Sequence, residues 1–312
     1  MIHDAGPHVV HVHNTFPLLS PAIYWAAANA QVPVVQTLHN FRLLCAQATF
    51  LREGEVCEDC LGKLPWRGVL RKCYRNSTVQ SAALVAMLGL HRTIGTYRHK
   101  VNRYIALSQF SKHKFVEGGL PAQKISVKPN FVDTGPAGKV LRVGGLYVGR
   151  LSPEKGLHVL VAALRALPHL TLNVIGTGPQ LPLLRGNSQI RLLGQQDSES
   201  VLRKMCESAF LVMPSIGYEQ FPRTLVEAFA CGLPVIASRL GPLAELVEDG
   251  QTGLLFEPGS TRDLAEKIGF AASKPSVMRE MGRNARAEYE AKYTPQRNYQ
   301  QLMEIYSDVT AH

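Results

Sequence analysis

The chain has no long hydrophobic run, and this lack argues against an integral membrane protein. Its longest apolar stretch, residues 82–90, is far shorter than the roughly 20 residues that a membrane-spanning helix needs. The first residues, Met1-Ile2-His3-Asp4, have no positive segment leading into an apolar stretch, so no signal peptide is predicted. Repeats and low-complexity tracts are also absent. These absences predict a cytoplasmic protein, in which six cysteines favour thiols or a metal over disulfides.

Acidic residues are scarce in the first half of the chain. Residues 1–135 contain 15 lysines and arginines against 7 aspartates and glutamates, whereas the remainder contains 19 against 17. A basic first half attracts nucleic acid, phospholipid headgroups or an anionic acceptor, and charge alone does not choose among them. The apolar share of 46% and the charged share of 19% are typical of a folded protein. The length of 312 residues favours two domains.

Short strand-like runs alternate with helix-like segments along almost the whole chain. In the first part we predict strands at residues 8–13, 33–39, 104–108 and 125–129, and helices at 21–30, 78–101 and 108–118. Further strands are predicted at 145–148, 171–175, 190–193, 210–213, 234–237 and 253–256, with helices between them. This α/β alternation predicts parallel sheets that helices cover on both faces.

A connector between the two domains is predicted at residues 133–139, which contain glycine and proline but no apolar stripe. The first domain is then residues 1–133, with a cysteine-rich insertion at 42–75, and the second is residues 139–294. We expect residues 295–312 to form a helix that returns to the first domain.

Two helices of the second domain are predicted in detail. The first follows Ser152, which can cap it, and has Pro153 at its first position and Lys155 in its first turn. Its apolar face consists of Leu157, Leu160, Val161 and Leu164. The second helix is predicted from about Arg223 to residue 231, with Gly232 as its C-terminal glycine.

Two cations and two carboxylates near these helices suit a sugar joined to a nucleotide through two phosphates. Arg150 leaves a strand at its carboxyl end, where parallel sheets bind ligands, and Lys155 follows closely. The forked guanidinium, the ammonium and the N-terminus of a helix all suit a diphosphate. Glu219 and Glu227 stand eight residues apart and suit hydroxyl groups of the sugar and the ribose. Their separation along the ligand differs from the facing acid and base of a glycoside hydrolase.

Residues 8–312 resemble the family 4 retaining glycosyltransferases, which have the GT-B fold. The segments that carry the resemblance, besides the two glutamates, are Gly149-Arg150 with Lys155-Gly156, Pro214-Ser215, Ala230-Cys231-Gly232-Leu233-Pro234-Val235-Ile236-Ala237-Ser238, Gly241 with Glu245-Leu246-Val247, Asp249-Gly250 with Gly253-Leu254-Leu255, and Lys128-Pro129-Asn130-Phe131-Val132-Asp133. Each glycine alone would be a weak signal, but the combination is specific. The resemblance implies two Rossmann-like domains facing a central cleft, with the donor held mainly by the second domain.

The resemblance also implies roles for individual residues. Arg150 and Lys155 would bind the diphosphate and stabilise the leaving group, so that catalysis would need no metal or other cofactor. Glu219 would bind the 3- and 4-hydroxyls of the donor sugar, Glu227 the ribose, and His39 would reach the sugar from the first domain. The other implied donor-site residues are Leu193 and Gly194 beside the base, and Phe221, Pro222, Arg223, Thr224 and Leu225, whose amides would line the sugar and phosphates. Gln220 next to this segment and His13 near the cleft are further candidates for the donor site. Retention would follow from same-face attack on an oxocarbenium-like centre, with the leaving phosphate taking the proton.

The chain departs from the family pattern at two places. The glycines that usually follow the first glutamate are here Gln220 and Pro222, and proline cannot donate an N–H, so the sugar pocket is expected to differ. The family also has about three strands before the one predicted at residues 8–13, including a glycine-rich loop without counterpart here. We therefore expect a fragment, a misplaced start, or a reduced first domain. An incomplete sheet would expose a strand edge that could pair with another chain, making a homo-oligomer.

Four cysteines form a second group of interest. Cys57 and Cys60 make a CxxC pair, with Cys45 placed 12 residues before it and Cys73 placed 13 residues after it. Four thiolates with such spacing suit tetrahedral zinc, and residues 42–75 lack a clear apolar period. Structural zinc, free thiols, and disulfide or redox use remain as alternatives. The other two cysteines, Cys206 and Cys231, are predicted to be small buried apolar residues.

The apolar run at residues 82–90 has basic residues on both sides. They are Arg71, Lys72 and Arg75 before it, and Arg92, Arg98, Lys100 and Arg103 after it. Two interpretations remain, a plain buried helix and an interfacial helix that contacts acidic lipid at the inner membrane face. His11 and His13 share one face of a strand, but metal binding by them is disfavoured because no carboxylate or cysteine accompanies them.

The sequence thus predicts a retaining glycosyltransferase that moves a hexose from a UDP- or GDP-linked donor to a hydroxyl of a sugar, lipid-linked or small-molecule acceptor. By family analogy its setting is cell-surface polysaccharide or glycolipid synthesis. The alternative is a non-catalytic or incomplete nucleotide-sugar-binding module. A zinc-dependent nucleic-acid binder ranks lower, because it leaves the second domain unexplained and no aromatic and basic platform supports it.

Overall fold

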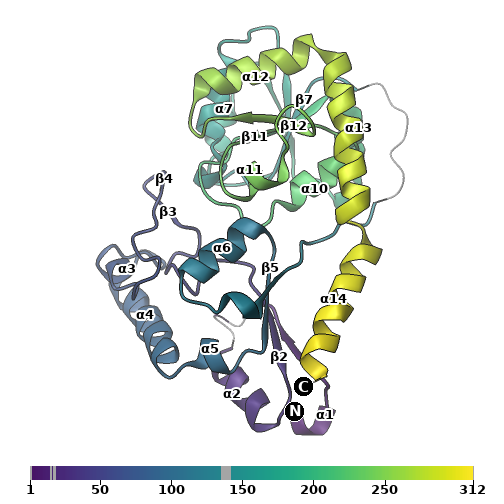
Figure 1. The fold of residues 1–312 in the computed structure, drawn as a ribbon. Helices are drawn as coiled ribbons and strands as arrows, with labels where there is room; N and C mark the ends of the chain where they lie inside the picture. The colour runs from purple at the N-terminus through teal and green to yellow at the C-terminus, as the bar shows by residue number, and fades with distance from the viewer. Residues whose placement is uncertain (1, 15, 17–18, 135–141, 312) are drawn as a thin grey trace. The chain divides into compact units, whose positions relative to one another are not determined.

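A computed structural model of the chain describes residues 2–14, 16, 19–134 and 142–311 (Figure 1). The chain divides into two compact units. Unit 1 comprises Met1–Arg52, Val56–Asn130 and Asn298–His312, and unit 2 comprises Glu53–Glu55 and Phe131–Arg297. Most of the connector predicted at residues 133–139 lies outside the described residues. No helix in the described ranges has the length and apolar character that crossing a bilayer requires.

Unit 1 contains a four-stranded parallel sheet with the order β1-β2-β5-β6. Its strands are β1 (Val10–Val12), β2 (Val34–Thr37), β5 (Arg103–Ala106) and β6 (Ile125–Val127). Its helices include α1 (Ile2–Ala5), α2 (Ala22–Asn29), α4 (Thr78–Thr93), α5 (Thr96–His99), α6 (Gln109–Glu117) and α14 (Pro295–Thr310), with a 3-10 turn at Ala122–Lys124. All four predicted strands are present, and β2 is buried at every position. β1 lies at one end of this sheet, where a strand of another chain could pair with it. The predicted homo-oligomer stays a prediction.

The helix α14 packs on the sheet of unit 1. Ile305 and Val309 form one hydrophobic cluster with Val35 of β2 and Ile105 of β5. Near the start of the helix, the buried Lys128 ammonium donates to the Asn298 side-chain oxygen at 3.0 Å. These contacts attach the end of the chain to the first sheet, in the manner expected for residues 295–312.

The single helix predicted at residues 78–101 is wrong, because the structure divides it into α4 and α5. Gly95 stands between them with a φ of 71°, in the left-handed region that glycine adopts without strain. Its N–H donates to the carbonyl of Arg92, which closes the end of α4. A Cβ on Gly95 would lie 2.4 Å from the His99 ring. The break therefore depends on local backbone geometry that the apolar pattern does not reveal.

The cysteine-rich segment has little regular structure. It contains a two-stranded ribbon of β3 (Leu51–Arg52) and β4 (Glu55–Val56), and the single-turn helix α3 (Arg67–Leu70). One side of the segment is anchored by aromatic packing, with the Phe41 and Phe50 ring centroids 4.8 Å apart and both rings buried. Residues 42–75, which lack a clear apolar period in the sequence, thus form only these short elements.

Unit 2 contains a six-stranded parallel sheet with the order β12-β11-β10-β7-β8-β9 (Figure 1). Its strands are β7 (Gly145–Val148), β8 (Leu172–Ile175), β9 (Ile190–Gly194), β10 (Phe210–Met213), β11 (Val235–Ser238) and β12 (Gly253–Phe256). Its α-helices are α7 (Leu157–Leu164), α8 (Leu181–Leu184), α9 (Ser198–Glu207), α10 (Arg223–Ala230), α11 (Pro242–Leu246), α12 (Thr261–Ser273) and α13 (Pro275–Lys292). The six strands lie within about one residue of their predicted positions. β10, β11 and β12 are rich in Val, Ile, Leu and Phe and are buried at every position, as in a sheet covered on both faces.

The order of strands in unit 2 places a ligand crevice. From β7 the chain proceeds outward through β8 and β9, then returns to β10 on the other side of β7 and continues through β11 and β12. Neighbouring strands whose connections run in opposite directions leave a crevice at their carboxyl ends. The segments that follow β7 and β10, starting at Gly149 and Pro214, therefore meet at one place.

The helix predicted to start at Pro153 is wrong in its first turn. Pro153–Lys155 form a 3-10 turn, and α7 begins only at Leu157, after Gly156 with a φ of 66°. The hydroxyl of Ser152 donates to the Glu154 carboxylate at 2.6 Å and does not cap the helix. The apolar face of Leu157, Leu160, Val161 and Leu164 is fully or almost fully buried, as predicted. Lys155 consequently lies in a tight turn before the helix, not in its first turn.

Candidate active site

A cavity of about 280 Å³ lies in unit 2 where β7 and β10 end. Its lining includes seven of the predicted site residues, Arg150, Lys155, Glu219, Phe221, Pro222, Arg223 and Thr224. The other lining residues are Tyr147, Val148, Gly149, Met213 and Ser215. This is the crevice that the strand order predicts, and it brings together two separate segments of the chain, residues 147–155 and 213–224.

Lys155 and Glu219 form the central ion pair of this cavity. The lysine Nζ donates to Glu219 Oε1 at 2.5 Å, and the Ser215 hydroxyl donates to the same oxygen at 2.8 Å. Only 22% of the lysine side chain and 16% of the glutamate side chain are exposed, so water screens the pair less than a surface pair. The carboxylate is thereby fixed in position between a cation and a hydroxyl.

Arg150 lies at the rim of the cavity. Its side chain is 71% exposed and forms an ion pair with Glu154 at 3.1 Å. Its carbonyl accepts a hydrogen bond from the Tyr147 hydroxyl at 3.0 Å, which fixes the backbone but leaves the guanidinium at the surface. Arg150 therefore has more conformational freedom than Lys155.

The start of α10 forms one wall of the cavity. Pro222 precedes the helix and has no N–H to offer a ligand. The amide of Arg223 donates to the Phe221 carbonyl and that of Leu225 to the Pro222 carbonyl, each at 2.9 Å. The Leu225 side chain is fully buried. The amides of Arg223 and Leu225, two of those predicted to line the donor, are thus already bonded within the chain.

Glu227 lies one turn inside α10, and Glu219 precedes the helix, as the sequence predicts. The Arg223 Nε donates to Glu227 Oε1 at 3.0 Å. Burial raises the pKa of Glu227, and Arg223 opposes that rise. In the part of the chain that the structure describes, Arg223 lines the cavity and its partner Glu227 does not.

Three other predicted donor residues also stand apart from the cavity lining. Leu193 and Gly194 end β9, which is separated from β7 by β8. The Gly194 carbonyl accepts from the Gly176 amide at 2.8 Å, and that of Leu193 accepts from the Gln196 side chain at 2.6 Å. Gln220 is partly buried next to the wall formed by Phe221. Their roles beside the base and the sugar stay predictions.

The two predicted histidines meet in unit 1, where β1 and β2 end. His13 Nδ1 and His39 Nε2 are 2.7 Å apart, and the two rings are stacked with centroids at 5.0 Å. They line a cavity of about 70 Å³ together with Asn14 and Asn40, whose side chains share a hydrogen bond of 3.1 Å. Parallel strands bring His13 and His39 together, because β1 and β2 pair in register and end at the same edge.

His11 and Lys128 belong to the same region, although neither was predicted to have a role in the site. His11 bonds Tyr306 at 2.6 Å and Thr37 at 2.8 Å through its two ring nitrogens. Burial, and then the nearby His13, Lys128 and His39, lower the pKa of His11 to about 4. Burial lowers the pKa of Lys128 to about 8. Two sequence features could have pointed to these residues. They are the alternating histidines of the first strand for His11 and the Lys128-Pro129-Asn130 motif for Lys128.

The low pKa of His11 predicts a loss of stability in mild acid. The unfolded chain binds the imidazole proton below about pH 6.5, and the folded chain binds it only near pH 4. Stability is therefore expected to fall as the pH drops from about 6.5 towards 4, by about 1–2 kcal/mol for a half-exposed ring. Urea unfolding followed by tryptophan fluorescence measures this in unit 1, which contains both Trp25 and Trp66.

The control for this prediction separates His11 from other acid-sensitive groups. His11→Gln should show a flatter profile between pH 7 and 4.5 than the unchanged protein, whereas His158→Gln, at an exposed position in unit 2, should follow it. Identical slopes for His11→Gln and the unchanged protein would contradict the assignment.

The four cysteines of the CxxC segment come together in unit 1. All four line one small cavity of about 20 Å³. Burial and the neighbouring thiols raise the pKa of Cys60 and of Cys73. Nevertheless, the described part of the chain contains no group of three His, Cys, Asp or Glu side chains arranged to hold a metal ion. Of the two other cysteines, Cys231 is buried as predicted, whereas Cys206 is partly exposed.

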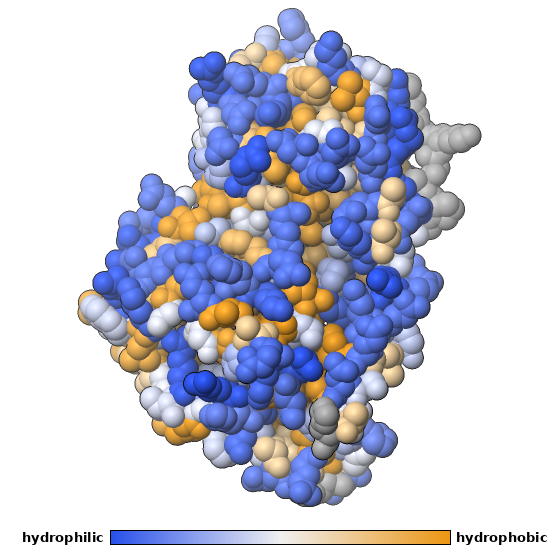
Figure 2. Space-filling view, viewed as in Figure 1, coloured by the Kyte–Doolittle hydropathy of each residue, from blue (hydrophilic) through white to orange (hydrophobic). Residues whose placement is uncertain are grey.

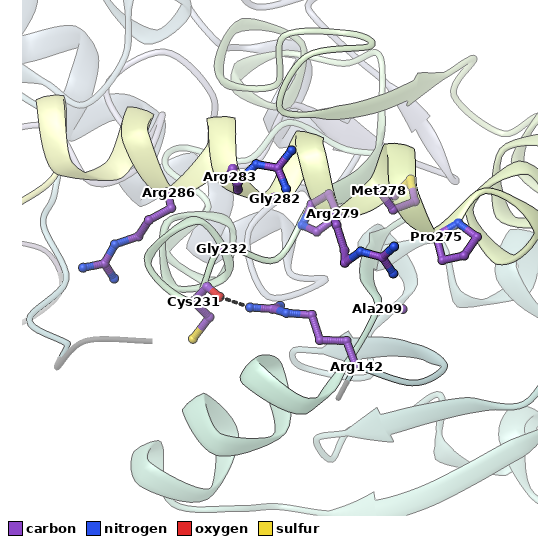
Figure 3. A pocket seen from close by; sticks show the side chains of 11 residues that line it. Arg142, Ala209, Cys231, Gly232, Pro275, Met278, Arg279, Gly282, Arg283 and Arg286 are labelled. Carbon is purple, nitrogen blue, oxygen red and sulfur yellow. Dashed lines mark hydrogen bonds between the residues drawn. The ribbon is translucent and has the colours of Figure 1, made fainter. Parts of the chain in front are cut away.

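A larger cavity of about 440 Å³ lies between α13 and the end of α10 (Figure 3). Its lining includes the arginines Arg142, Arg279, Arg283 and Arg286. Arg142 donates to the Cys231 carbonyl, and Arg286 donates to the Ala230 carbonyl and pairs with Glu290 at 2.7 Å. Arg142 and Arg286 thus offset the negative C-terminal end of α10. Since no predicted donor residue lines it, this cavity does not belong to the candidate active site.

Two family models match the chain, one over each half. Residues 1–135 match the model of Glycosyltransferase Family 4, and residues 143–273 match that of Glycosyl transferases group 1. An uncharacterised glycosyltransferase of Methanocaldococcus jannaschii is 33% identical over 172 residues, which cover 53% of this chain and 48% of that protein. A phosphatidyl-myo-inositol mannosyltransferase of Mycobacterium leprae is 29% identical over a region that covers 78% of this chain and 68% of that protein. The chain spans about half the length of the first of these relatives.

Solved structures show the fold. HepE of Anabaena, crystallised in complex with UDP, superposes with a TM-score of 0.73 at 22% identity, over 98% of this chain and 80% of that one. Sucrose-phosphate synthase from Thermosynechococcus elongatus superposes with a TM-score of 0.73 at 21% identity, over 99% of this chain and 75% of that one. With both family models matched and two parallel Rossmann-like sheets in place, the chain belongs to the group 1, family 4 glycosyltransferases of the GT-B fold.

Proposed function

We propose that the protein is a retaining hexosyltransferase that uses a UDP- or GDP-linked hexose as donor. One observation carries this proposal. Lys155, Arg150, Glu219 and the start of α10 line one cavity at the crevice of a parallel sheet. This set offers cations and a helix N-terminus to a diphosphate and a fixed carboxylate to sugar hydroxyls. The proposal is consistent with HepE, whose crystal structures contain UDP and UDP-glucose.

The proposed reaction is a displacement at the anomeric carbon of the hexose. The bond from that carbon to the phosphate oxygen breaks, and its electron pair leaves with the diphosphate. Lys155 and Arg150 stabilise the negative charge that develops there, which is the term that contributes most in such reactions. The acceptor hydroxyl bonds to the same face of the carbon, and its proton passes to the leaving phosphate oxygen. The configuration at the anomeric carbon is thereby retained.

Glu219 is proposed to position the hexose. Its carboxylate is fixed by Lys155 and Ser215, so a sugar hydroxyl would meet an oriented acceptor at no further cost in side-chain entropy. A sugar hydroxyl that donates a hydrogen bond to Glu219 would also lie within reach of the Lys155 ammonium. We further propose that Glu227 binds the ribose once Arg223 turns towards the phosphates. His13 and His39 of unit 1 are proposed to contact the sugar of the donor or the acceptor.

The acceptor is proposed to be a hydroxyl in cell-surface polysaccharide or glycolipid synthesis. Two relatives point in this direction by their names, the mannosyltransferase that acts on phosphatidyl-myo-inositol and an amylovoran biosynthesis glycosyltransferase of Erwinia amylovora. The second is 30% identical over 64% of this chain and 55% of its own. An acceptor that carries phosphate or lies in an acidic membrane would suit the basic first half.

A donor panel with product analysis tests the proposed function. UDP- and GDP-linked hexoses are incubated with the full chain and candidate acceptors, and release of nucleotide and transfer of sugar are measured. The anomeric configuration of the product is read by NMR from its coupling constant, and retention is expected. Calorimetry measures donor binding in parallel. Binding with neither transfer nor donor hydrolysis would overturn the proposal in favour of a nucleotide-sugar-binding module.

We also propose that α3 and α4 contact an anionic membrane. Six of the exposed large hydrophobic residues lie in or beside these helices, namely Leu64, Trp66, Leu70, Val79, Leu90 and Ile94. Figure 2 shows hydrophobic and hydrophilic side chains interspersed in this region. Basic residues, among them Arg67 and Lys72, lie on the same stretch. An apolar face with a basic rim is the pattern of interfacial helices. Buried Leu84, Val85 and Leu88 show that the other face of α4 packs on the protein.

The membrane proposal predicts salt-sensitive binding to vesicles. The full chain should float with vesicles that contain phosphatidylglycerol at low salt, and binding should weaken as salt rises. Trp66→Ser and Leu70→Ser together should reduce binding at least about fivefold, because each removes exposed apolar area. The matched control is Phe270→Ser, at an exposed apolar position in unit 2. Flotation at neither salt concentration would reject the proposal.

A further inference from the structure

The four cysteines of the CxxC segment are brought to one place by three separate stretches of backbone. Cys45 follows the loop after β2, Cys57 and Cys60 follow β4, and Cys73 follows α3. All four line the same cavity, whose volume of about 20 Å³ is enough for a single small atom or ion. No part of the proposed transfer reaction uses these cysteines.

The CxxC pair is presented by consecutive tight turns. The Leu61 amide donates to the Glu58 carbonyl at 2.9 Å, and the Lys63 amide donates to the Cys60 carbonyl at 3.2 Å. The Cys57 amide donates to the Phe50 carbonyl at 2.7 Å, which fixes the start of the pair against the neighbouring strand. These bonds hold the backbone on both sides of Cys60, and the cavity lining brings Cys57 and Cys60 to one place, as a zinc site with two-residue spacing requires.

The backbone around the cavity is held in costly conformations. Six residues of this region that are not glycine have a positive φ, namely Ala48, Phe50, Glu53, Lys72, Arg75 and Asn76. A left-handed residue costs roughly 1–2 kcal/mol, and it persists only where the surroundings determine it. The aromatic pair of Phe41 and Phe50 supports one side of the segment. On the cavity side, the described lining residues are mainly the four cysteines and two arginines, so support for this side must come from them.

The charge around the cavity suits a dianionic centre. Four thiolates and one divalent cation carry a net charge of minus two. Arg52 and Arg71 both line the cavity, and the Arg71 Nη1, which pairs with Asp59 at 2.5 Å, also lies 3.6 Å from Cys57 Sγ as a donor. Hydrogen bonds from second-layer donors to ligating sulfurs orient the ligands and offset their charge.

We propose that Cys45, Cys57, Cys60 and Cys73 bind one structural zinc ion. On binding, four S–H bonds break, four Zn–S bonds form and four protons pass to solvent. The described residues contain no group of three His, Cys, Asp or Glu side chains arranged to hold a metal ion, so binding must draw the four thiols together to Zn–S bonds of about 2.3 Å. The ion would join Cys45, the CxxC pair and Cys73, and so hold the strained loops together.

The consequence for the protein is stability of unit 1, not chemistry. A structural zinc site contributes its binding energy directly to folding. Loss of zinc is therefore expected to destabilise the β3–β4 ribbon, which lies between Cys45 and Cys57, and α3, which lies between Cys60 and Cys73. α4 packs on α3, so the surface proposed to contact membranes depends on the same ion.

Metal content and cobalt substitution of the full chain test the proposal. Protein purified without chelators should contain close to one zinc per chain. Replacing zinc by Co²⁺ should give the intense visible bands of a tetrahedral thiolate site and the near-ultraviolet sulfur-to-cobalt band. A strong chelator should lower the melting temperature, and added Zn²⁺ should restore it. These readouts do not depend on transferase activity.

Variants separate the proposed ligands from the other cysteines. Cys57→Ser with Cys60→Ser should abolish the cobalt bands and reduce bound zinc at least tenfold. Cys206→Ser, in α9 of unit 2, should leave both unchanged. Should the double variant fail to fold, removal of zinc from the unchanged protein and its return provide the same comparison. Less than about 0.1 zinc per chain without cobalt bands, an iron–sulfur spectrum, or a disulfide within the group would each overturn the proposal.

Discussion

Replacing Lys155 or Glu219 by alanine is expected to lower the rate of sugar transfer at least about 100-fold, as the loss of one transition-state donor commonly does. Lys155 is the most buried of the three cations that line the cavity, and its charge acts close to the proposed leaving group. Its removal would also leave the Glu219 carboxylate, only 16% exposed, without its cation. The rate is measured with the donor panel described above.

The shared hydrogen bond predicts that the two substitutions do not add. Each variant disrupts the same Lys155–Glu219 pair, so the double variant should lose much less than the product of the two single losses. Glu219→Gln keeps the shape but not the charge, and should fall between the unchanged protein and Glu219→Ala. Lys204→Ala removes an ion pair of similar length on the surface of α9 and should have little effect. Near-normal rates in Lys155→Ala and Glu219→Ala would contradict the assigned roles.

The fold of unit 2 was predictable because its strands carry a local signal. Strands buried on both faces must be apolar at every position, and β7, β10 and β12 were predicted with their exact ends. The start of α7 was not predictable. It depends on Gly156, where glycine is required both by the left-handed φ and by the close approach of the Pro214 carbonyl, which is almost 60 residues away in the chain. Local apolar spacing contains no information about such a contact.

In the candidate site, too, some features could be predicted from the sequence and others depend on the fold. Arg150, Lys155 and Glu219 were identified by residue type and motif, and the structure places all three on one cavity. The bond between Lys155 and Glu219 links residues 64 positions apart, so only the fold reveals it. His11 was missed because its partner Tyr306 lies 295 positions away in α14. The weaker predictions, for Leu193 and Gly194, rested on family resemblance alone.

Replacing Gly156 by alanine is expected to destabilise unit 2 by about 3 kcal/mol and to abolish donor binding. Its φ of 66° costs a non-glycine residue about 1 kcal/mol, and overpacking adds roughly 1–3 kcal/mol. The second cost arises because a Cβ at this position would lie 1.9 Å from the Pro214 carbonyl oxygen, which belongs to the backbone and cannot turn aside. The loops after β7 and β10 must separate, and they carry Lys155 and Ser215 into the cavity.

A matched substitution isolates the backbone clash. Gly250 has a φ of 79°, and a Cβ built there meets none of the described atoms within 4 Å, so Gly250→Ala should cost only the conformational term of about 1 kcal/mol. Amide hydrogen exchange in β7 and β10 measures the local stability, and calorimetry measures donor binding. Since unit 2 contains no tryptophan, urea unfolding is followed by circular dichroism. Equal losses in the two variants would show that the close approach of Gly156 to Pro214 does not support the donor cavity.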